Sequence, residues 1–380
     1  MQLVAKVRSI DHLRKFDYIL FFTVIAITAF GLVSLKSATY SMKYGAGIYK
    51  TQIYMAVAGT VIALFLNFID YRIYKTFALY LYGASVLMLL AVFFVGSGSD
   101  EVGAGSWLSI PGLFKFQPSE IAKIMYVLLI ALIFEKLSTV ENKAKYFIML
   151  MIFAVIPVGL IFKEPDAGTA LAFVVSFIIM LFVYGIKARF ILIGGGIIGA
   201  SIPIAWRFIL KPYQKNRILS IFQPELQTAD DLYQINKAKT AISSGQWFGQ
   251  GLFKGIQTQN NGIPIKESDF IFSVIGEEMG FVGVGVLLVL FTVLIIRIFY
   301  IAATAEDLYG TFVASGIGGI YLYHFLQNVG MNIGLLPITG IPLPFVSAGG
   351  SAMITNFIAM GIVLSISLRR SDGMFEKPGI

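Results

Sequence analysis

Asp269 is the last residue of a long polar segment, 211–269, and stands directly before an apolar run. Apolar surroundings can raise the pKa of a carboxyl group, which suits a general base that removes a proton from a hydroxyl group. The alternative for Asp269 is a helix N-cap or a partner of the helix dipole, because Asp favours helix starts. Both interpretations are open from the residues alone.

Glu120 and Lys123 form a second group of interest, within the segment 117–123. A spacing of three places both side chains on one helix face. Pro118 and Ser119 predict the start of that helix, with Ser119 as its cap. Unpaired charges in a membrane are costly, so one interpretation is a pair at a helix end whose charges neutralise each other. The other interpretation is that the pair, together with Gln117, forms the polar wall of an outward cavity.

Asp166 lies in the charged turn 163–169 between two apolar runs. The turn has two interpretations. It is a solvated loop, or Asp166 caps the next helix and presents a carboxylate to a cation or a sugar hydroxyl.

The segment 211–269 combines basic residues, amides and aromatics. Lys215 and Arg217 suit a pyrophosphate, and Gln257 and Gln259 suit carbohydrate. The stretch 230–243 predicts a short helix with a polar face at the membrane interface. An ordinary outer loop has a similar composition.

The composition identifies the class of protein that carries these groups. Hydrophobic residues make up 57% of the chain, charged residues 13%, and the mean hydropathy is +0.81, far from soluble averages. We predict an all-α polytopic membrane protein of about ten transmembrane helices, with the large extracellular loop between spans 7 and 8. The predicted spans are 17–35, 51–69, 77–95, 119–134, 146–162, 167–184, 189–209, 270–301, 309–331 and 351–368.

The distribution of basic residues predicts the orientation. Fifteen Lys and Arg fall on the side of the termini, whereas the short loops opposite carry only Lys43, Lys50, Lys115 and Lys163. By the positive-inside rule, both termini are cytoplasmic and 211–269 is outside. The net charge of +8 follows from this topology and does not call for nucleic acid. The chain has no Cys, which excludes disulfides, a thiolate nucleophile and a zinc–cysteine site.

Two segments interrupt the helical pattern. The run 270–301 is long for one crossing, and 276–280 is expected to bend it. At least one of Glu277 and Glu278 should be protonated, paired or capping a break, given the cost of charge at that depth. The Pro- and Gly-rich segment 327–351 predicts a re-entrant or closely packed loop.

Five motifs in these segments resemble the SEDS family, which includes RodA, FtsW and SpoVE, and the similarity to the RodA branch is strongest. The resemblance covers essentially the whole chain, 1–380, as a single integral membrane domain. The motifs are Gln-Pro-Ser-Glu at 117–120, Glu-Pro-Asp-Ala-Gly-Thr at 164–169, Gln-Lys-Asn-Arg-Ile at 214–218, Ser-Asp-Phe-Ile-Phe-Ser-Val-Ile-Gly-Glu-Glu-Met-Gly-Phe at 268–281, and Gly-Leu-Leu-Pro-Ile-Thr-Gly-Ile-Pro-Leu-Pro-Phe at 334–345.

The resemblance implies a peptidoglycan glycosyltransferase of the cytoplasmic membrane. Such an enzyme polymerises lipid II into β-1,4 glycan on the outer face, for cell elongation and shape. Its implied partners are a class B penicillin-binding protein and membrane proteins of the elongation complex. Asp269 matches the essential acidic residue of the family, and Glu120 and Lys123 match its charged cavity pair.

A divalent cation, Mg²⁺ or Mn²⁺, is expected to stabilise the departing pyrophosphate, with Asp269 and Asp166 as candidate ligands. Two other functions compete with polymerisation. A flippase or transporter of lipid-linked precursors would use Glu120, Lys123 and Glu278 as a path, and a non-catalytic scaffold would not need Asp269. Polar residues clustered at the outer edge, rather than through the midplane, favour the enzyme.

Overall fold

The computed structural model describes residues 15–95, 106–110, 114–141, 143–164, 166–186 and 229–370, with isolated positions at 189, 196, 203, 207 and 215. Within this part, nine helices overlap nine of the predicted spans, and the span 189–209 lies outside it except for single positions. The nine are α2 (Tyr18–Ala38), α3 (Gly45–Phe68), α4 (Ile73–Val95), α5 (Pro118–Thr139), α6 (Lys143–Lys163), α7 (Ala167–Val183), α12 (Ile271–Thr304), α13 (Leu308–Asn332) and α14 (Gly350–Leu368).

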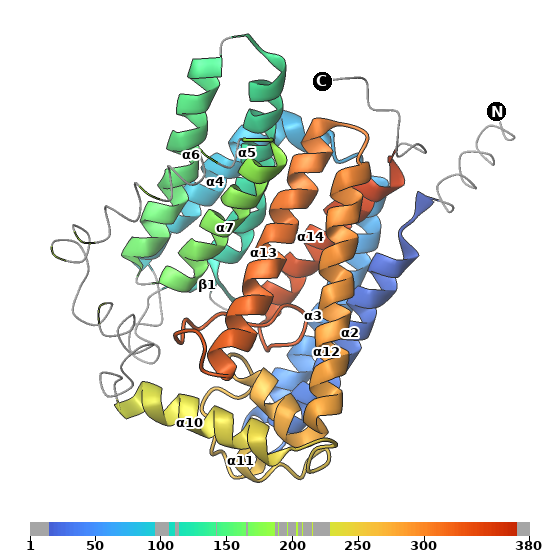
Figure 1. Ribbon diagram of the computed structural model, residues 1–380, viewed down its shortest axis with the longest axis vertical. Coiled ribbons are helices and arrows are strands. Elements are labelled where there is room, and N and C mark those ends of the chain that lie inside the picture. Colours follow the sequence, from blue (N-terminus) through green and yellow to red (C-terminus); the bar gives the residue numbers. More distant parts are fainter. Residues whose placement is uncertain are drawn as a thin grey trace, which may run out of the picture.

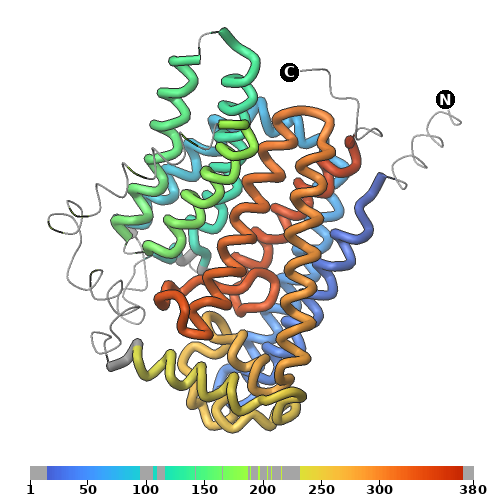
Figure 2. Tube along the Cα trace, in the orientation of Figure 1, coloured from blue at the N-terminus to red at the C-terminus, as the bar shows by residue number. Residues whose placement is uncertain are grey.

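The helices form a bundle along the long axis of the molecule (Figure 1). Among the described helices, six are long and apolar enough to cross a membrane, namely α2, α3, α4, α6, α12 and α14. The protein is therefore an all-α polytopic membrane protein. The start of α2 and the end of α14 lie at the same end of the bundle (Figure 2), where Arg370 pairs with Asp17 at 3.7 Å.

The opposite end of the bundle carries an outer layer, made of α10 (Ala229–Ser244), α11 (Ile256–Gln259) and the loops around them. The helix predicted at 230–243 is thus confirmed as α10, which lies across the ends of the long helices (Figure 1). Its apolar side, with Ile235, Ala238 and Ala241, is buried, and α10 contacts α12 and α13. Protein therefore covers the apolar face of this helix.

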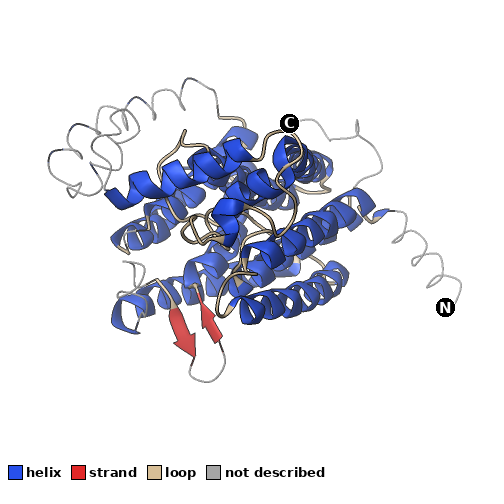
Figure 3. Cartoon of the chain, turned by 90° about the horizontal axis from the view of Figure 1, so that it is seen from below, coloured by secondary structure: helices blue, strands red, loops and turns tan. Residues whose placement is uncertain are grey.

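A short antiparallel hairpin leads into α5. Its strands β1 (Leu108–Ile110) and β2 (Phe114–Phe116) pair with Leu108 opposite Phe116, at the margin of the bundle (Figure 3). The N-cap of α5 is Gln117 and Pro118 occupies its first turn. The prediction that Ser119 caps this helix is wrong, because Pro118 lacks an N–H and already fits the first helical position.

The segment 327–351 is only partly irregular. Helix α13 continues to Asn332 and α14 begins at Gly350, so the packed loop is 333–349. The prediction of an irregular backbone from Gln327 is wrong for 327–332, because the helix continues to Asn332 and ends before Gly334, which has φ 74°. Most of the part 341–347 of this loop is buried, and it packs against α2, where a Cβ on Gly31 would lie 2.6 Å from the Cα of Val346.

Candidate active site

Helix α12 is broken near its outer end. Gly280 has φ 65° and ψ −164°, values that glycine tolerates. The loop 245–251 fills the break with four backbone hydrogen bonds. They are Gln250 N to Glu277 O (2.9 Å), Gly251 N to Glu278 O (3.0 Å), Phe281 N to Gln246 O (2.8 Å) and Val282 N to Trp247 O (3.1 Å). The expected bend is confirmed, and the first turns of α12 belong to the outer layer.

The two acidic residues at the break are structural. Glu277 is fully buried, and its carboxylate accepts from Gln257 N (2.7 Å) and from Thr258 N (2.9 Å) in the first turn of α11. Glu278 accepts from Gln259 Nε2 at 2.9 Å. Glu277 thus caps α11, as anions do at helix N-termini, and both residues fix the outer loop onto α12.

Asp269 lies just ahead of this fixed segment. The N-cap of α12 is Phe270, which makes no side-chain cap bond, so the interpretation of Asp269 as the N-cap is wrong. Its Oδ1 atom accepts from Ser268 Oγ at 3.0 Å. Its Oδ2 atom faces Gly340, where a Cβ on that glycine would lie 3.5 Å away. Among the described residues, no Lys or Arg forms an ion pair with Asp269.

Burial sets the protonation of this carboxyl group. Desolvation raises the pKa of Asp269 to about 6, with smaller contributions from the carboxylates of Glu267 and Asp166, while the Ser268 hydroxyl opposes the shift. A carboxylate with a pKa near 6 is ionised at neutral pH and is more basic than an ordinary Asp. Asp269 can therefore accept a proton from a hydroxyl group placed against it.

Asp166 belongs to the same region, because its charge acts on Asp269. It caps α7, with Oδ1 accepting from Thr169 N at 2.9 Å, and Oδ2 accepts from Gln117 Nε2 at 3.3 Å. Burial raises the pKa of Asp166, and burial together with Asp166 raises the pKa of Glu164 to about 7. The capping interpretation of Asp166 is confirmed, and Gln117 lies beside it.

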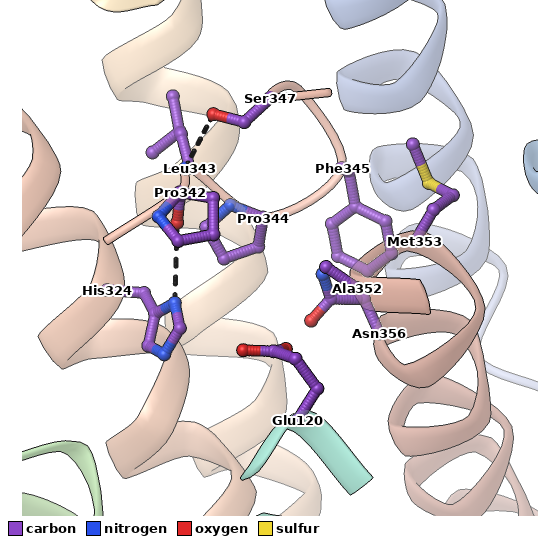
Figure 4. A pocket seen from close by; sticks show the side chains of 10 residues that line it. All are labelled: Glu120, His324, Pro342, Leu343, Pro344, Phe345, Ser347, Ala352, Met353 and Asn356. Atoms are coloured by element: carbon purple, nitrogen blue, oxygen red, sulfur yellow. Dashed lines mark hydrogen bonds between the residues drawn. The ribbon is translucent and has the colours of Figure 1, made fainter. Parts of the chain in front are cut away.

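Glu120 and Lys123 form a buried ion pair, with Nζ to Oε1 at 2.7 Å and both side chains at most 5% exposed. Lys123 also lies 3.0 Å from His324 Nε2, and His324 Nδ1 lies 3.3 Å from Pro342 O. Glu120 and His324 line a small cavity beneath the loop 333–349 (Figure 4), together with Pro342, Leu343, Pro344, Phe345, Ser347, Ala352, Met353 and Asn356. Of the pair, Glu120 is among the residues that line this cavity, which the loop closes on one side, and Lys123 is not.

The other predicted site residues are less closely connected to Asp269. Ser119 is buried, and its hydroxyl has no partner among the described residues. Lys215 is an isolated, partly buried position, and Arg217 lies outside the described residues. Gln257 Oε1 accepts from Lys237 at 3.5 Å, and Gln259 Nε2 contacts Ser37 and Glu278. Gln257 thus contacts α10, and Gln259 contacts α2 and α12, so their role in substrate binding stays a prediction.

Three residues of the site were not singled out from the sequence. His324, Asn328 and Asn332 are buried in α13 and recur every four residues, so they share one helix face. This row of polar residues in an otherwise apolar helix is the sequence pattern that could have identified them. In the structure, the row faces the loop 333–349 and the start of α12.

The chain is similar to known proteins over most of its length. The family model of the cell cycle proteins FtsW, RodA and SpoVE matches residues 17–372. A probable peptidoglycan glycosyltransferase FtsW of Trichlorobacter lovleyi is 36% identical over 93% of this chain and 94% of its own length. The peptidoglycan glycosyltransferase MrdB of Escherichia coli is 36% identical over 85% of this chain and 86% of its own.

Two solved structures have the same fold. One is a peptidoglycan synthase complex that coordinates polymerisation and crosslinking, with a TM-score of 0.80 and 30% identity over 94% of this chain and 99% of that chain. The other is the rod shape determining protein RodA of Thermus thermophilus, with a TM-score of 0.68 and 28% identity over 94% and 98% of the two chains. The sequence match and the shared fold agree, and the chain belongs to the FtsW/RodA/SpoVE family.

Proposed function

We propose that this chain is a peptidoglycan glycosyltransferase that joins the disaccharide units of lipid II into β-1,4 glycan strands on the outer face of the cytoplasmic membrane, for cell elongation and shape. The names of its relatives support the activity. The observation that carries the site assignment is Asp269, a partly buried carboxylate with a raised pKa and no ion-pair partner among the described residues. It stands where the outer layer meets a membrane helix.

The proposed reaction is one inverting displacement. The carboxylate of Asp269 takes the proton of the 4-hydroxyl group of the acceptor sugar. The oxygen attacks the anomeric carbon of the donor, the bond from that carbon to the pyrophosphate oxygen breaks, and undecaprenyl pyrophosphate leaves with the electron pair. An α-linked donor gives a β-linked product. The proton returns from Asp269 to solvent before the next cycle.

The negative charge on the departing pyrophosphate has to be stabilised by positive charge nearby. Lys266 is committed elsewhere, because its ammonium donates to Ser41 Oγ and Asn261 Oδ1, each at 2.8 Å, and to Thr258 O. Lys123 is held by Glu120 and His324. These contacts support a divalent cation, Mg²⁺ or Mn²⁺, which would stabilise the charge on the departing phosphates.

The donor groups near Asp269 fit such an ion only in part. Among the described residues, no cluster of three or more His, Asp or Glu side chains forms a complete metal site. Asp269 and Asp166 would supply one or two carboxylates, and substrate phosphates and water the other oxygens. Mg²⁺ is commonly bound in this way.

We infer that both termini are cytoplasmic and that the outer layer faces outward. The support is the excess of basic residues at the end opposite the outer layer. Several of them are paired there, including Arg72 with Glu306 (2.6 Å), Lys75 with Glu135 (2.7 Å), Arg297 with Asp17 (2.9 Å) and Arg369 with Asp70 (3.3 Å).

The proposed partner is a class B penicillin-binding protein, which would crosslink the strands as they form, within a complex of elongation proteins. The similarity to a synthase complex that coordinates polymerisation and crosslinking supports this. The alternative is a flippase for lipid-linked precursors. The location of Glu278 disfavours it, since this carboxylate binds α11 instead of lining a path.

The test uses purified chain, alone and with its co-purified crosslinking partner, incubated with labelled lipid II. A ladder of glycan products on a gel is the expected result. Reconstituted vesicles carrying labelled lipid II on one leaflet measure translocation in parallel. Translocation without polymer in either preparation would overturn the proposal in favour of the flippase.

A further inference from the structure

Two fully buried asparagines of α13 converge on the backbone of Asp269. Asn332 Nδ2 donates to Asp269 O at 2.9 Å, and Asn328 Nδ2 donates to the same oxygen at 3.1 Å. Asn328 Nδ2 also donates to Ile341 O at 2.8 Å. The carbonyl of Asp269 is thereby fixed to α13 and to the loop 333–349.

Asn332 also caps α12 from outside that helix. Its Oδ1 atom accepts from Ser273 N at 3.2 Å and from Ser273 Oγ at 2.6 Å. Ser273 is the third residue of α12, and the N–H at this position is the one that an N-cap side chain normally takes. The N-cap residue Phe270 cannot do so. A neighbouring helix therefore supplies the missing cap.

Other aspartates of the chain show what this arrangement avoids. Asp17, Asp166 and Asp307 each cap their own helix, and their Oδ1 atoms accept from the backbone N–H three residues later, at 2.9, 2.9 and 2.8 Å. Asp269 stands one residue too early to do this and makes no such bond. Its carboxylate stays out of the helix cap.

The backbone on the other side of Asp269 is held from the same direction. Ser347 Oγ donates to Ser268 O at 2.7 Å, and Ala348 N donates to Glu267 O at 2.8 Å. Three consecutive carbonyls, 267–269, are therefore bound by α13 and the loop that follows it. Gly340, with φ 67°, lies beside Oδ2 of Asp269.

We propose that Asn332, assisted by Asn328, is a positioning residue that caps α12 in place of Asp269 and so leaves the Asp269 carboxylate free to meet the acceptor sugar. This inference rests on the proposed function, in which Asp269 is the base. Without Asn332, Ser273 loses its side-chain acceptor and the carbonyl of Asp269 loses one of its two donors. The backbone that carries the Asp269 carboxylate would then be held less firmly.

The test compares two substitutions of Asn332 with wild type in lipid II polymerisation. For Asn332→Ala we expect kcat to fall about tenfold or more, since small displacements of a catalytic group are costly, with KM nearly unchanged. Asn332→Asp keeps an acceptor for Ser273 but loses the donor to Asp269 O. Its kcat should therefore lie between those of Asn332→Ala and wild type, again with KM nearly unchanged.

A matched control on the same helix is Gln327→Ala. Gln327 Nε2 donates to Pro337 O at 3.0 Å and so also binds the loop 333–349, whereas its side chain has no hydrogen bond to 267–273 among the described residues. We expect this variant to keep the wild-type kcat and KM. Elution as a single species in detergent checks that each variant is folded. If Asn332→Ala does not fold, the comparison of kcat and KM is made with Asn332→Asp.

The outcomes separate this inference from the proposed function. If Asp269→Asn still polymerises lipid II, the base assignment itself fails. If Asp269→Asn is inactive while the Asn332 variants keep the wild-type kcat, only the positioning role fails. A fall in kcat at unchanged KM in both Asn332 variants, smaller for Asn332→Asp, supports it.

Discussion

Lys123 Nζ lies 3.0 Å from His324 Nε2 and 2.7 Å from Glu120 Oε1. An ammonium group has donors only, so Nε2 of His324 must carry a lone pair and the ring proton is on Nδ1, which faces Pro342 O at 3.3 Å. His324 is therefore neutral and connects the ion pair of α5 to the loop 333–349. One buried cation is shared between two acceptors.

The first prediction concerns the stability of this group. Glu120→Ala leaves the buried ammonium of Lys123 without its counter-ion, which costs several kcal/mol. The double variant Glu120→Gln, Lys123→Met removes both charges and should be destabilised less. Thermal unfolding in detergent measures both. As a control, Glu306→Gln removes the exposed pair with Arg72 and should cost less than about 1 kcal/mol. A double variant as unstable as Glu120→Ala would contradict the prediction.

The second prediction tests the break in α12. A Cβ on Gly249 would lie 2.2 Å from Glu278 O, and Gly249 has φ 78°, so Gly249→Ala should lower the melting temperature and loosen the outer layer. The control is Gly47→Ala in α3, where no atom lies within 4 Å of the added Cβ and the substitution should be neutral or stabilising. Equal melting temperatures for the two variants would show that the break tolerates a side chain.

The third prediction is the pH dependence of stability at Asp269. Because burial raises its pKa to about 6, the folded state prefers the protonated carboxyl group more than the unfolded state does. The stability of the wild type therefore falls as the pH rises from about 4, the ordinary pKa of Asp, to about 6, and the loss is complete at higher pH. Asp269→Asn should melt at a higher temperature than wild type at pH 8, with a smaller difference at pH 5. A difference that grows on acidification would contradict the raised pKa.

The fourth prediction is dependence on a divalent cation. In 211–268, seven Lys and Arg stand against four Asp and Glu, and the Lys266 ammonium is held by neutral acceptors. Polymerisation should stop in EDTA and return with Mg²⁺ or Mn²⁺. Undiminished activity in chelator would assign the leaving-group charge to Lys and Arg alone.

Most of the fold could be predicted because the signal is local. The length of each apolar run predicted the nine spans that the structure describes, and the glycines at 276–280 predicted the break in α12. The span predicted at 309–331 nearly equals α13, whereas the irregular segment, predicted from its prolines and glycines, was placed too early, at Gln327 instead of Ile333. The amides of Asn328 and Asn332 are satisfied by Ile341 O, Asp269 O and Ser273, partners that only the tertiary structure reveals.

The candidate site was predicted where its residues are close in sequence. The spacing of Glu120 and Lys123 gave the ion pair, and the turn at Asp166 gave the cap of α7. His324 could not be placed, because its neighbour Lys123 is 201 positions away in the chain. The same limit applies to Asn332, whose role as a cap of α12 depends on the packing of two helices.

The most direct measurement is lipid II polymerisation by purified Asp269→Asn, compared with wild type and with Asp70→Asn. Asp70 pairs with Arg369 at the opposite end of the bundle, so its variant controls for the loss of a carboxylate as such. We predict that Asp269→Asn folds and makes no glycan, whereas Asp70→Asn polymerises near the wild-type rate. Polymerisation by Asp269→Asn at near the wild-type rate would contradict the assignment of Asp269 as the base.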